Sequence, residues 1–247
     1  MYSIHAKTAL ITGAAKRIGR AIALKLAQQG AHVVIHYHTS QSEAQSAAEE
    51  ARSYGVKAWT IQTDLSDLAQ AETMLSKLPA EIKPLDILIN SASIFPKDRV
   101  LDFSAAAFQQ NMTVNALAPL WLARAFARQT QAGSIINFLD TRILDYDEKH
   151  AAYHLSKRTL FSVTRMLSRE LAPGIRVNGV APGLILPPPG ENKDYLEQLK
   201  HSNLLQRIGT LDDITEAVLF LLRNDFITGQ IIYVDGGRHL KGAMYGA

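Results

Sequence analysis

The segment that decides the fold is Thr12-Gly13-Ala14-Ala15-Lys16-Arg17-Ile18-Gly19-Arg20. It lies between an apolar run at Thr8–Thr12 and a helical pattern at Ala14–Gln29. Gly13 permits a tight turn, and Gly19 lets the helix pack closely against the strand. Free amides at the start of such a helix can hold a pyrophosphate. Two glycines alone are common in many contexts, but their place at the first strand–helix junction predicts a dinucleotide site.

Short apolar runs alternate with longer helical patterns along the rest of the chain. The expected strands are Thr8–Thr12, His32–His38, Ala58–Thr63, Leu85–Ala92, Gly133–Leu139, Ile175–Val180 and Ile231–Val234. The expected helices are Ala14–Gln29, Glu43–Ser53, Leu68–Leu78, Ala105–Gln129 with a break near Pro119, Ala151–Leu171, and Asp212–Arg223 with Thr210 as its cap. This order predicts an α/β fold, a doubly wound (Rossmann) parallel sheet of about seven strands with helices on both faces. We expect one dinucleotide-binding and catalytic domain over residues 1–247.

Composition narrows the function further. The 247 residues are 47% hydrophobic and 20% charged, which is typical of a globular protein. The net charge is only +3 and no block of like charges occurs, so a nucleic-acid partner is not expected. Without cysteine the chain has no disulfides, thiolate catalysis or zinc–thiolate sites, and we expect no metal. Residues 1–19 lack a signal-peptide layout, and no apolar run approaches the ~20 residues of a membrane span. A cytoplasmic protein is expected.

Three polar residues in the second half of the chain indicate chemistry. Tyr153 and Lys157 are four residues apart on an expected helix and share one face of it, and Asp140 precedes Tyr153 by thirteen positions. We expect the ammonium group to lower the pKa of the phenol from its ordinary value of about 10. Such a tyrosine beside a nicotinamide can complete a hydride transfer, which predicts a reductase. The alternative is an exposed tyrosine and a solvated lysine, and the glycine turn upstream favours the reductase.

The end of the second strand bears on the choice of nucleotide. A site for unphosphorylated NAD usually has a carboxylate here for the ribose hydroxyl, but none occurs from Gly30 to Ser42. The hydrogen-bonding groups present are His36, Tyr37, His38, Thr39 and Ser40, with Lys16, Arg17 and Arg20 across the turn. Such donors suit a 2′-phosphate, so we predict NADPH. We interpret His36 itself as an ordinary strand-end residue.

Two further features have open interpretations. Asp64 can accept a hydrogen bond from adenine, or Asp64 or Ser66 can cap the next helix. The segment Pro182–Asn192 contains three consecutive prolines and two glycines. It is either a surface loop or a semi-rigid lid over a site, and its length favours the lid.

The motifs together resemble the short-chain dehydrogenase/reductase family over nearly the whole chain. They are Thr12–Gly19, Asp64, Asn90-Ser91-Ala92-Ser93, Asn115, Tyr153-x-x-x-Lys157, Pro182-Gly183 and Asp235-Gly236-Gly237. The resemblance implies a homotetramer, or a dimer, built on the two long helices. It implies catalytic roles for Asp140, Tyr153, Lys157 and Asn115, the last supporting a water path to the lysine; a merely polar helix face is the alternative for Asn115. The implied cofactor-binding residues are Gly13, Arg17, Ile18, Gly19, Tyr37, His38, Thr39, Ser40, Asp64, Leu65, Asn90, Ser91, Ala92, Tyr153, Lys157, Pro182 and Gly183.

Departures from the broad family are similar to the pteridine reductases, including the bacterial dihydromonapterin reductases. These departures are Arg17, where most members have glycine, and Asp140, where most have serine, and the motifs His36-Tyr37-His38 and Ser93-x-Phe95 add to the resemblance. A third departure from the broad family is Asn90-Ser91-Ala92-Ser93, where most members read Asn-Asn-Ala-Gly. The implied substrate-binding residues are Arg17, Ser93, Phe95, Asp140 and Tyr153. Phe95 would stack on the pterin, and ordinary packing is the alternative. Thr39 replaces an arginine common in the subgroup, which implies a weaker hold on the 2′-phosphate.

The expected function is NADPH-dependent reduction of a dihydropterin, dihydromonapterin or dihydrofolate to the tetrahydro form. A carboxylate at position 140 would repel a developing alkoxide, and it suits either a substrate that presents N–H groups or a relay that feeds protons to the tyrosine. One alternative is a carbonyl reductase of the 3-oxoacyl or sugar type. Another is a non-catalytic protein that senses NADP(H).

Overall fold

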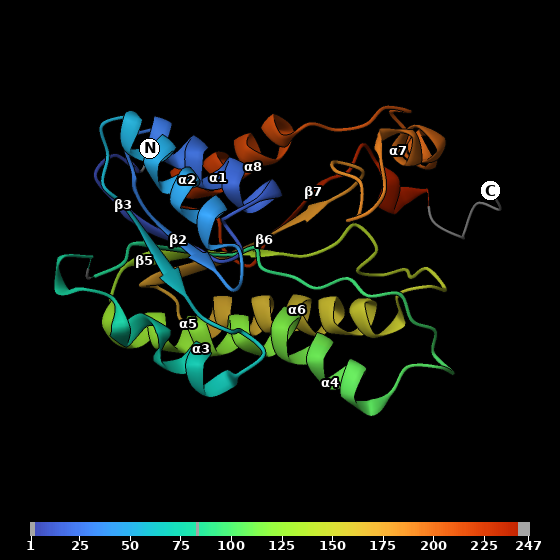
Figure 1. Ribbon diagram of the computed structural model, residues 1–247, viewed down its shortest axis with the longest axis horizontal. Coiled ribbons are helices and arrows are strands. Elements are labelled where there is room, and N and C mark those ends of the chain that lie inside the picture. Colours follow the sequence, from blue (N-terminus) through green and yellow to red (C-terminus); the bar gives the residue numbers. More distant parts are fainter. Residues whose placement is uncertain (1–2, 83, 242–247) are drawn as a thin grey trace.

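A seven-stranded parallel sheet forms the centre of the molecule (Figure 1), as predicted. The computed structural model describes residues 3–82 and 84–241, so both ends of the predicted domain extend beyond the described residues. The strand order is β3-β2-β1-β4-β5-β6-β7. The strands are β1 (Thr8–Ile11), β2 (His32–Tyr37), β3 (Ala58–Gln62), β4 (Ile87–Asn90), β5 (Gly133–Phe138), β6 (Ile175–Pro182) and β7 (Ile231–Val234).

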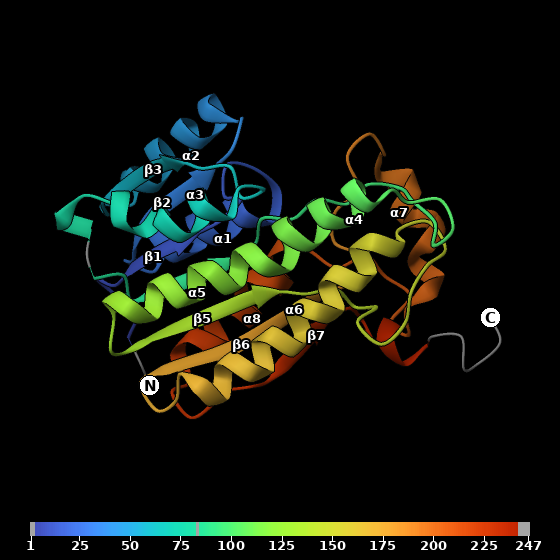
Figure 2. The same ribbon diagram turned by 90° about the horizontal axis from the view of Figure 1, so that it is seen from below.

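Helices cover both faces of the sheet (Figures 1 and 2). One layer consists of α1 (Arg17–Gln28), α2 (Gln41–Ser53) and α8 (Leu211–Arg223). The other consists of α3 (Leu68–Met74), α4 (Ala105–Met112), α5 (Ala118–Gln129) and α6 (Ala151–Glu170). A short helix, α7 (Lys193–Leu199), lies at the same end of the molecule as α4. None of the helices in the described part of the chain is long and apolar enough to cross a bilayer.

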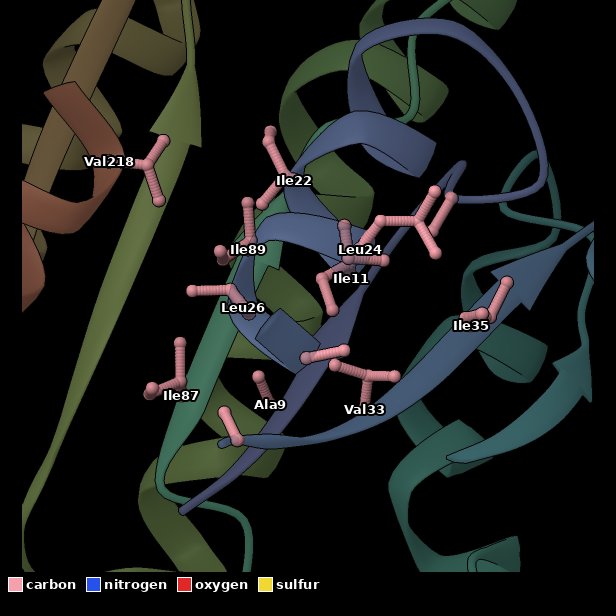
Figure 3. Packing of buried hydrophobic residues seen from close by; sticks show 14 of the residues in the cluster. Ala9, Ile11, Ile22, Leu24, Leu26, Val33, Ile35, Ile87, Ile89 and Val218 are labelled. Atoms are coloured by element: carbon pink, nitrogen blue, oxygen red, sulfur yellow. The ribbon is translucent and has the colours of Figure 1, made fainter. Parts of the chain in front are cut away.

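The sheet is buried on both faces because each face packs against a helical layer. All four residues of β1 and of β4 are buried, as expected for central strands of a parallel sheet. Figure 3 shows one of the two resulting cores, where Ile22 of α1 and Val218 of α8 meet Ile11 and Ile89 of the sheet. Each such side chain contributes roughly 1.5–3 kcal/mol by burial.

The topology fixes where a ligand can bind. The strand order reverses at β1. The chain first adds β2 and β3 on one side of β1 and then returns to place β4, parallel to β1, on its other side. In open parallel sheets the crevice for a ligand lies beyond the carboxyl ends of the strands at such a switch point. The glycine turn after β1 and the segment after β4 therefore face one another.

Several predicted boundaries were wrong for identifiable reasons. Helix α1 begins at Arg17 rather than Ala14, because the turn at Gly13 continues through Lys16. The predicted helix 105–129 divides at a π-helical turn, Thr113–Leu117, which ends two residues before Pro119, so the interruption near Pro119 was predicted correctly. The predicted helix 68–78 changes to a 3₁₀ turn at Leu75–Lys77. Helix α2 begins two residues earlier than predicted.

Caps and short elements gave a mixed outcome. Thr210 caps α8 as predicted, in a capping box with Asp213. The prediction that Asp64 or Ser66 caps α3 was wrong, because Asp67 accepts the free amides there. Helix α7 was missed; only Asn192, which caps it, signals its start. Strand β4 is shorter than the predicted 85–92, since Leu85 is buried without pairing as strand, and Ser91 and Ala92 turn away from the sheet and are only partly buried.

Candidate active site

A cleft of about 650 Å³ lies at the carboxyl ends of the strands. That volume suits a cofactor or drug-sized ligand. Of the predicted site residues, the cleft is lined by Gly13, Arg17, Ile18, Gly19, His38, Asp64, Leu65, Ser91, Ala92, Ser93, Phe95, Asp140, Tyr153, Lys157, Pro182 and Gly183. Tyr37, Thr39, Ser40, Asn90 and Asn115 do not line it. The tertiary structure thus brings most of the predicted residues together from six different strand ends.

The glycine turn is shaped for a close ligand. Gly13 has a left-handed φ of 65°, and a Cβ there would lie 2.9 Å from the Ala92 Cα. A Cβ on Gly19 would lie 2.5 Å from the carbonyl oxygen of Gly13, so only glycine allows α1 to start this close to β1. Thr12 Oγ1 accepts hydrogen bonds from the backbone N–H of Ser91 and of Ala92, each at 3.0 Å. These contacts fit the predicted dinucleotide cradle.

The interpretation of His36 as a strand-end residue was wrong. Its ring is buried, and Nδ1 accepts a hydrogen bond from the Gly13 N–H at 3.1 Å. Nε2 therefore carries the proton and donates to the Thr63 carbonyl oxygen at 3.0 Å. Burial, opposed by the bond to Thr63, lowers the pKa of His36 to about 4. His36 holds the glycine turn against the end of β3 as a neutral imidazole.

Stability is expected to fall in acid because of His36. In the unfolded chain the imidazole takes up a proton below its ordinary pKa of 6.5. In the folded chain it takes up a proton only below its lowered pKa of about 4. The unfolded state binds more protons in this window, so the free energy of unfolding should drop as pH falls from 6.5 to 4, by on the order of 3 kcal/mol. Urea unfolding of wild type and His36→Gln across this range measures the effect. An unchanged pH dependence in His36→Gln would contradict it; His201→Gln, at an exposed site, is the control.

The three predicted catalytic groups lie together. The Tyr153 hydroxyl donates to Asp140 Oδ2 at 2.9 Å, and Lys157 Nζ lies 5.6 Å from the centre of the Tyr153 ring. Lys157 Nζ donates to the Phe138 carbonyl oxygen at 2.8 Å. Asp140 follows β5, and its other oxygen accepts the backbone N–H of Arg142 at 2.7 Å. Both carboxylate oxygens of Asp140 are therefore held in place.

The expected effect of Lys157 on the phenol is corrected by this geometry. Burial, and then the charge and hydrogen bond of Asp140, raise the pKa of Tyr153 well above its ordinary value. Burial lowers the pKa of Lys157 to about 8, with Asp140 acting in the opposite direction. The phenol is thus protonated at neutral pH in the ligand-free protein. Tyr153 is disposed to donate a proton rather than to accept one.

Phe95 forms an aromatic surface beside the phenol. Its ring meets Tyr153 edge-on, with ring centres 4.5 Å apart, and stacks on His150 at 3.8 Å with an interplanar angle of 14°. The Asp147 carboxylate is hydrogen-bonded to two imidazoles: Oδ1 lies 2.8 Å from His150 Nδ1, and Oδ2 lies 3.2 Å from His154 Nε2. Burial opposes ionisation of Asp147, but the two histidine hydrogen bonds lower its pKa well below the ordinary value. One face of Phe95 is therefore occupied by the protein.

Arg17 adopts a backbone conformation that glycine prefers. Its φ is 57°, which explains why a glycine is usual at this position in the family that the sequence resembles. The guanidinium group donates to the Pro187 carbonyl oxygen at 2.6 Å. Pro188 and Pro189 line the cleft, so the segment 182–192 borders the site, and its role as a lid stays a prediction. A strained arginine in the turn is consistent with a binding role.

The buried asparagines act below the cleft. Asn90 donates to Asn137 Oδ1 at 2.8 Å. The Asn115 amide donates to the Ile94 carbonyl oxygen and Ser156 Oγ, each at 3.0 Å, and Asn115 Oδ1 accepts the Ile94 N–H at 2.9 Å. Asn115 joins the segment after β4 to α6, and its water path to Lys157 stays a prediction.

The basic residues near the turn are only partly available to a 2′-phosphate. Arg20 is paired with Glu50 and does not line the cleft. Lys16 lines the cleft, half exposed, and pairs with Glu43 at 2.7 Å. His38 Nε2 lies 3.7 Å from Asp64. Lys16, Arg17 and Arg20 were predicted to lie near the phosphate, and this prediction was wrong for Arg20.

Sequence reasoning assigned no role to several residues that line the cleft. They are Arg142, Asp147, His150, His154, Tyr195 and Arg238. No motif marks the first five of them. Arg238 directly follows the Asp235-Gly236-Gly237 motif, and this was the signal available.

A parallel sheet with a glycine turn at its switch point, and a tyrosine–lysine pair in the adjoining cleft, define a nucleotide-dependent oxidoreductase. The chain belongs to the short-chain dehydrogenase/reductase family, because the family model described as enoyl-(acyl carrier protein) reductase matches residues 13–239. It is 31% identical to the 3-oxoacyl-[acyl-carrier-protein] reductase FabG of Staphylococcus aureus, over 95% of this chain and 98% of that protein.

Solved structures extend the comparison. FolM alternative dihydrofolate reductase 1 from Brucella canis, complexed with NADP, is 32% identical with a TM-score of 0.90 over 100% of both chains. The angucycline C-6 ketoreductase LanV, with bound NADP, is 30% identical with a TM-score of 0.88 over 96% of this chain and 97% of the other. The protein is thus an oxidoreductase of the NADP-dependent short-chain type, which confirms the predicted cofactor class.

Proposed function

We propose that this protein is an NADPH-dependent pteridine reductase that converts a dihydropterin, dihydromonapterin or dihydrofolate to the tetrahydro form. The observation that carries the proposal is the hydrogen bond from the Tyr153 hydroxyl to Asp140 Oδ2 at 2.9 Å. A carboxylate at this point would repel the alkoxide that forms from a ketone, and it would accept hydrogen bonds from the N–H groups of a pterin.

The proposed roles follow from the contacts in the cleft. NADPH supplies a hydride when bound. Tyr153, kept protonated by burial and by Asp140, donates the proton to ring nitrogen. Lys157 is positioned to hold ribose hydroxyls in exchange for the Phe138 carbonyl oxygen. Phe95 offers its free face to a flat heterocycle, and Arg17 and Ser93 line the same cleft.

The comparisons support two substrate classes. The FolM structures favour a dihydropterin, and so do Asp140 and Arg17, through which the sequence resembles the pteridine reductases. The FabG relatives and the ketoreductase structure favour the second candidate, a carbonyl reductase. Asp140 argues against the second candidate on charge.

A substrate panel tests the proposal. Loss of NADPH absorbance is followed with dihydropterins, dihydrofolate, 3-oxoacyl thioesters and sugar ketones in parallel. Turnover of the pterins well above that of the ketones supports the proposal. Faster turnover of the ketones than of the pterins would establish a carbonyl reductase. Tight NADPH binding without turnover of any substrate would indicate a non-catalytic protein that senses NADP(H).

The choice of NADPH over NADH is expected to depend on Lys16. Its ammonium can exchange Glu43 for a 2′-phosphate, so Lys16→Ala should lower kcat/KM for NADPH by about tenfold and leave that for NADH nearly unchanged. Arg20→Ala is the matched control, because Arg20 pairs with Glu50 outside the cleft. Equal losses with both cofactors in Lys16→Ala would show that this lysine does not read the phosphate.

We also propose that the chain acts in the cytoplasm as one dinucleotide-binding and catalytic domain and assembles into a homotetramer or a dimer. Exposed Leu155 and Met166 on α6 are compatible with an interface on the long helices. Light scattering after size-exclusion chromatography measures the assembly.

A further inference from the structure

Arg238 lines the same cleft as Tyr153 and Asp140. It follows Gly237, whose φ of 79° turns the chain after β7, and it opens a short 3₁₀ helix, Arg238–Leu240. Its neighbours in the cleft wall include Arg142, Tyr195 and Asp147. The proposed catalytic roles leave this arginine without a task.

The turn that carries Arg238 is tied to the catalytic loop. Asp235 is buried, and its carboxylate accepts hydrogen bonds from the N–H of Gly237 at 2.9 Å, the N–H of His239 at 2.8 Å and the hydroxyl of Thr141. His239 Nδ1 lies 2.9 Å from the same carboxylate. Thr141 is the residue after Asp140, so the backbone of Arg238 and the catalytic carboxylate share one support.

The guanidinium group has no partner in the described part of the chain. Its Nε is buried and unpaired, and no hydrogen bond or ion pair of its side chain is found among the described residues. The other lysines and arginines that line the cleft are engaged: Lys16 with Glu43, Arg17 with the Pro187 carbonyl oxygen, Arg142 with Asp147 at 3.8 Å, and Lys157 with the Phe138 carbonyl oxygen. A buried donor without a partner is unfavourable, and it is retained where a ligand supplies the acceptor.

Among the described residues, the nearby carboxylates make no hydrogen bond or ion pair with the Arg238 side chain. Asp140 is engaged by Tyr153 and the Arg142 backbone, and Asp147 by His150 and His154. Burial, and then the positive charge of Arg142, lower the pKa of Arg238, while the charges of Asp140, Tyr195 and Asp147 act in the opposite direction. A planar guanidinium group with several free donors is suited to a carboxylate or a phosphate.

We propose that Arg238 binds an anionic group carried by the side chain of the substrate, so that acidic pterins are preferred over neutral ones. The shared chemistry is an oxyanion, either a carboxylate, as in a glutamylated dihydropterin, or a phosphate ester. This inference rests on the proposed pterin reduction. Arg238 is a specificity residue in it and takes no part in the proton transfer.

The test uses steady-state kinetics with a neutral dihydropterin, dihydrofolate and a phosphorylated dihydropterin. For Arg238→Gln we expect KM for the acidic substrate that the site accepts, carboxylate or phosphate, to rise about tenfold or more while kcat stays nearly constant. KM for the neutral dihydropterin should stay unchanged. Arg238→Lys should recover part of the loss. The control is Lys200→Gln, which removes one exposed positive charge outside the cleft wall. Equal effects on neutral and acidic substrates, or no effect on either, overturn the inference.

A second measurement separates this inference from the proposed function. Acetoacetate and its neutral ethyl ester are tested in the same way, and folic acid and neutral 6-hydroxymethylpterin are titrated calorimetrically into the NADP-loaded protein. If pterins are not reduced but Arg238→Gln selectively weakens the acidic member of a pair, the pterin proposal fails and the role of Arg238 stands. If pterins are reduced and no pair depends on Arg238, only the role of Arg238 fails.

Discussion

Tyr153→Phe is expected to lower kcat for the preferred substrate by about 10²–10⁴-fold, the range of a lost general acid. The substitution removes only the hydroxyl, which donates to Asp140 at 2.9 Å, and keeps the ring against Phe95. NADPH affinity should therefore change little. The high pKa of Tyr153 makes the phenol a reservoir of the required proton at neutral pH, and phenylalanine has none to give.

Single-turnover reduction and NADPH binding, measured separately, check this result. The matched control is Tyr146→Phe, which removes an exposed hydroxyl outside the cleft and should leave the rate intact. Retention of most of the wild-type rate in Tyr153→Phe, with a folded protein that binds NADPH, would show that another group or water delivers the proton.

Asp140→Ser is expected to reduce pterin turnover by about 10²-fold or more and to increase turnover of neutral ketones. Serine offers the hydroxyl that a ketone oxygen requires and lacks the charge that would hold pterin N–H groups. Removing the carboxylate also removes one cause of the raised pKa of Tyr153, after burial. The high-pH limb of the rate profile should move to lower pH.

Asp145→Ser is the control for Asp140→Ser, since it changes the same residue type on the same loop outside the cleft wall. The comparison is made as kcat/KM for a dihydropterin and for a 3-oxoacyl substrate, with pH profiles for both. Unchanged pterin turnover in Asp140→Ser would show that Asp140 takes no part in the mechanism. The carbonyl reductase would then be the favoured function.

The elements that were predicted well depend on local rules. Alternating buried strands and amphipathic helices are written in short-range periodicity, and the Thr210 capping box and the break before Pro119 follow from the chemistry of one or two residues. The glycines at 13 and 19 could be interpreted because their reason is steric and local. Helix α7 carries no such periodicity over its seven residues, so it was missed.

The errors concern groups whose partners are distant in sequence. Arg20 was expected at a phosphate and is paired with Glu50, while His36 was expected to be passive and bridges Gly13 and Thr63. Neither pairing follows from spacing, because each joins different elements of the sheet and its helices.

The sequence by itself determined the sheet with its covering helices, the nucleotide turn, and the identity of the tyrosine, lysine and aspartate, since these depend on periodicity, on glycine and on fixed short spacings. Only the tertiary structure decided the state of the phenol, the stacking of Phe95 on His150 and the unpaired guanidinium of Arg238. Burial and the meeting of distant charges set those properties, and neither exists until the chain has folded.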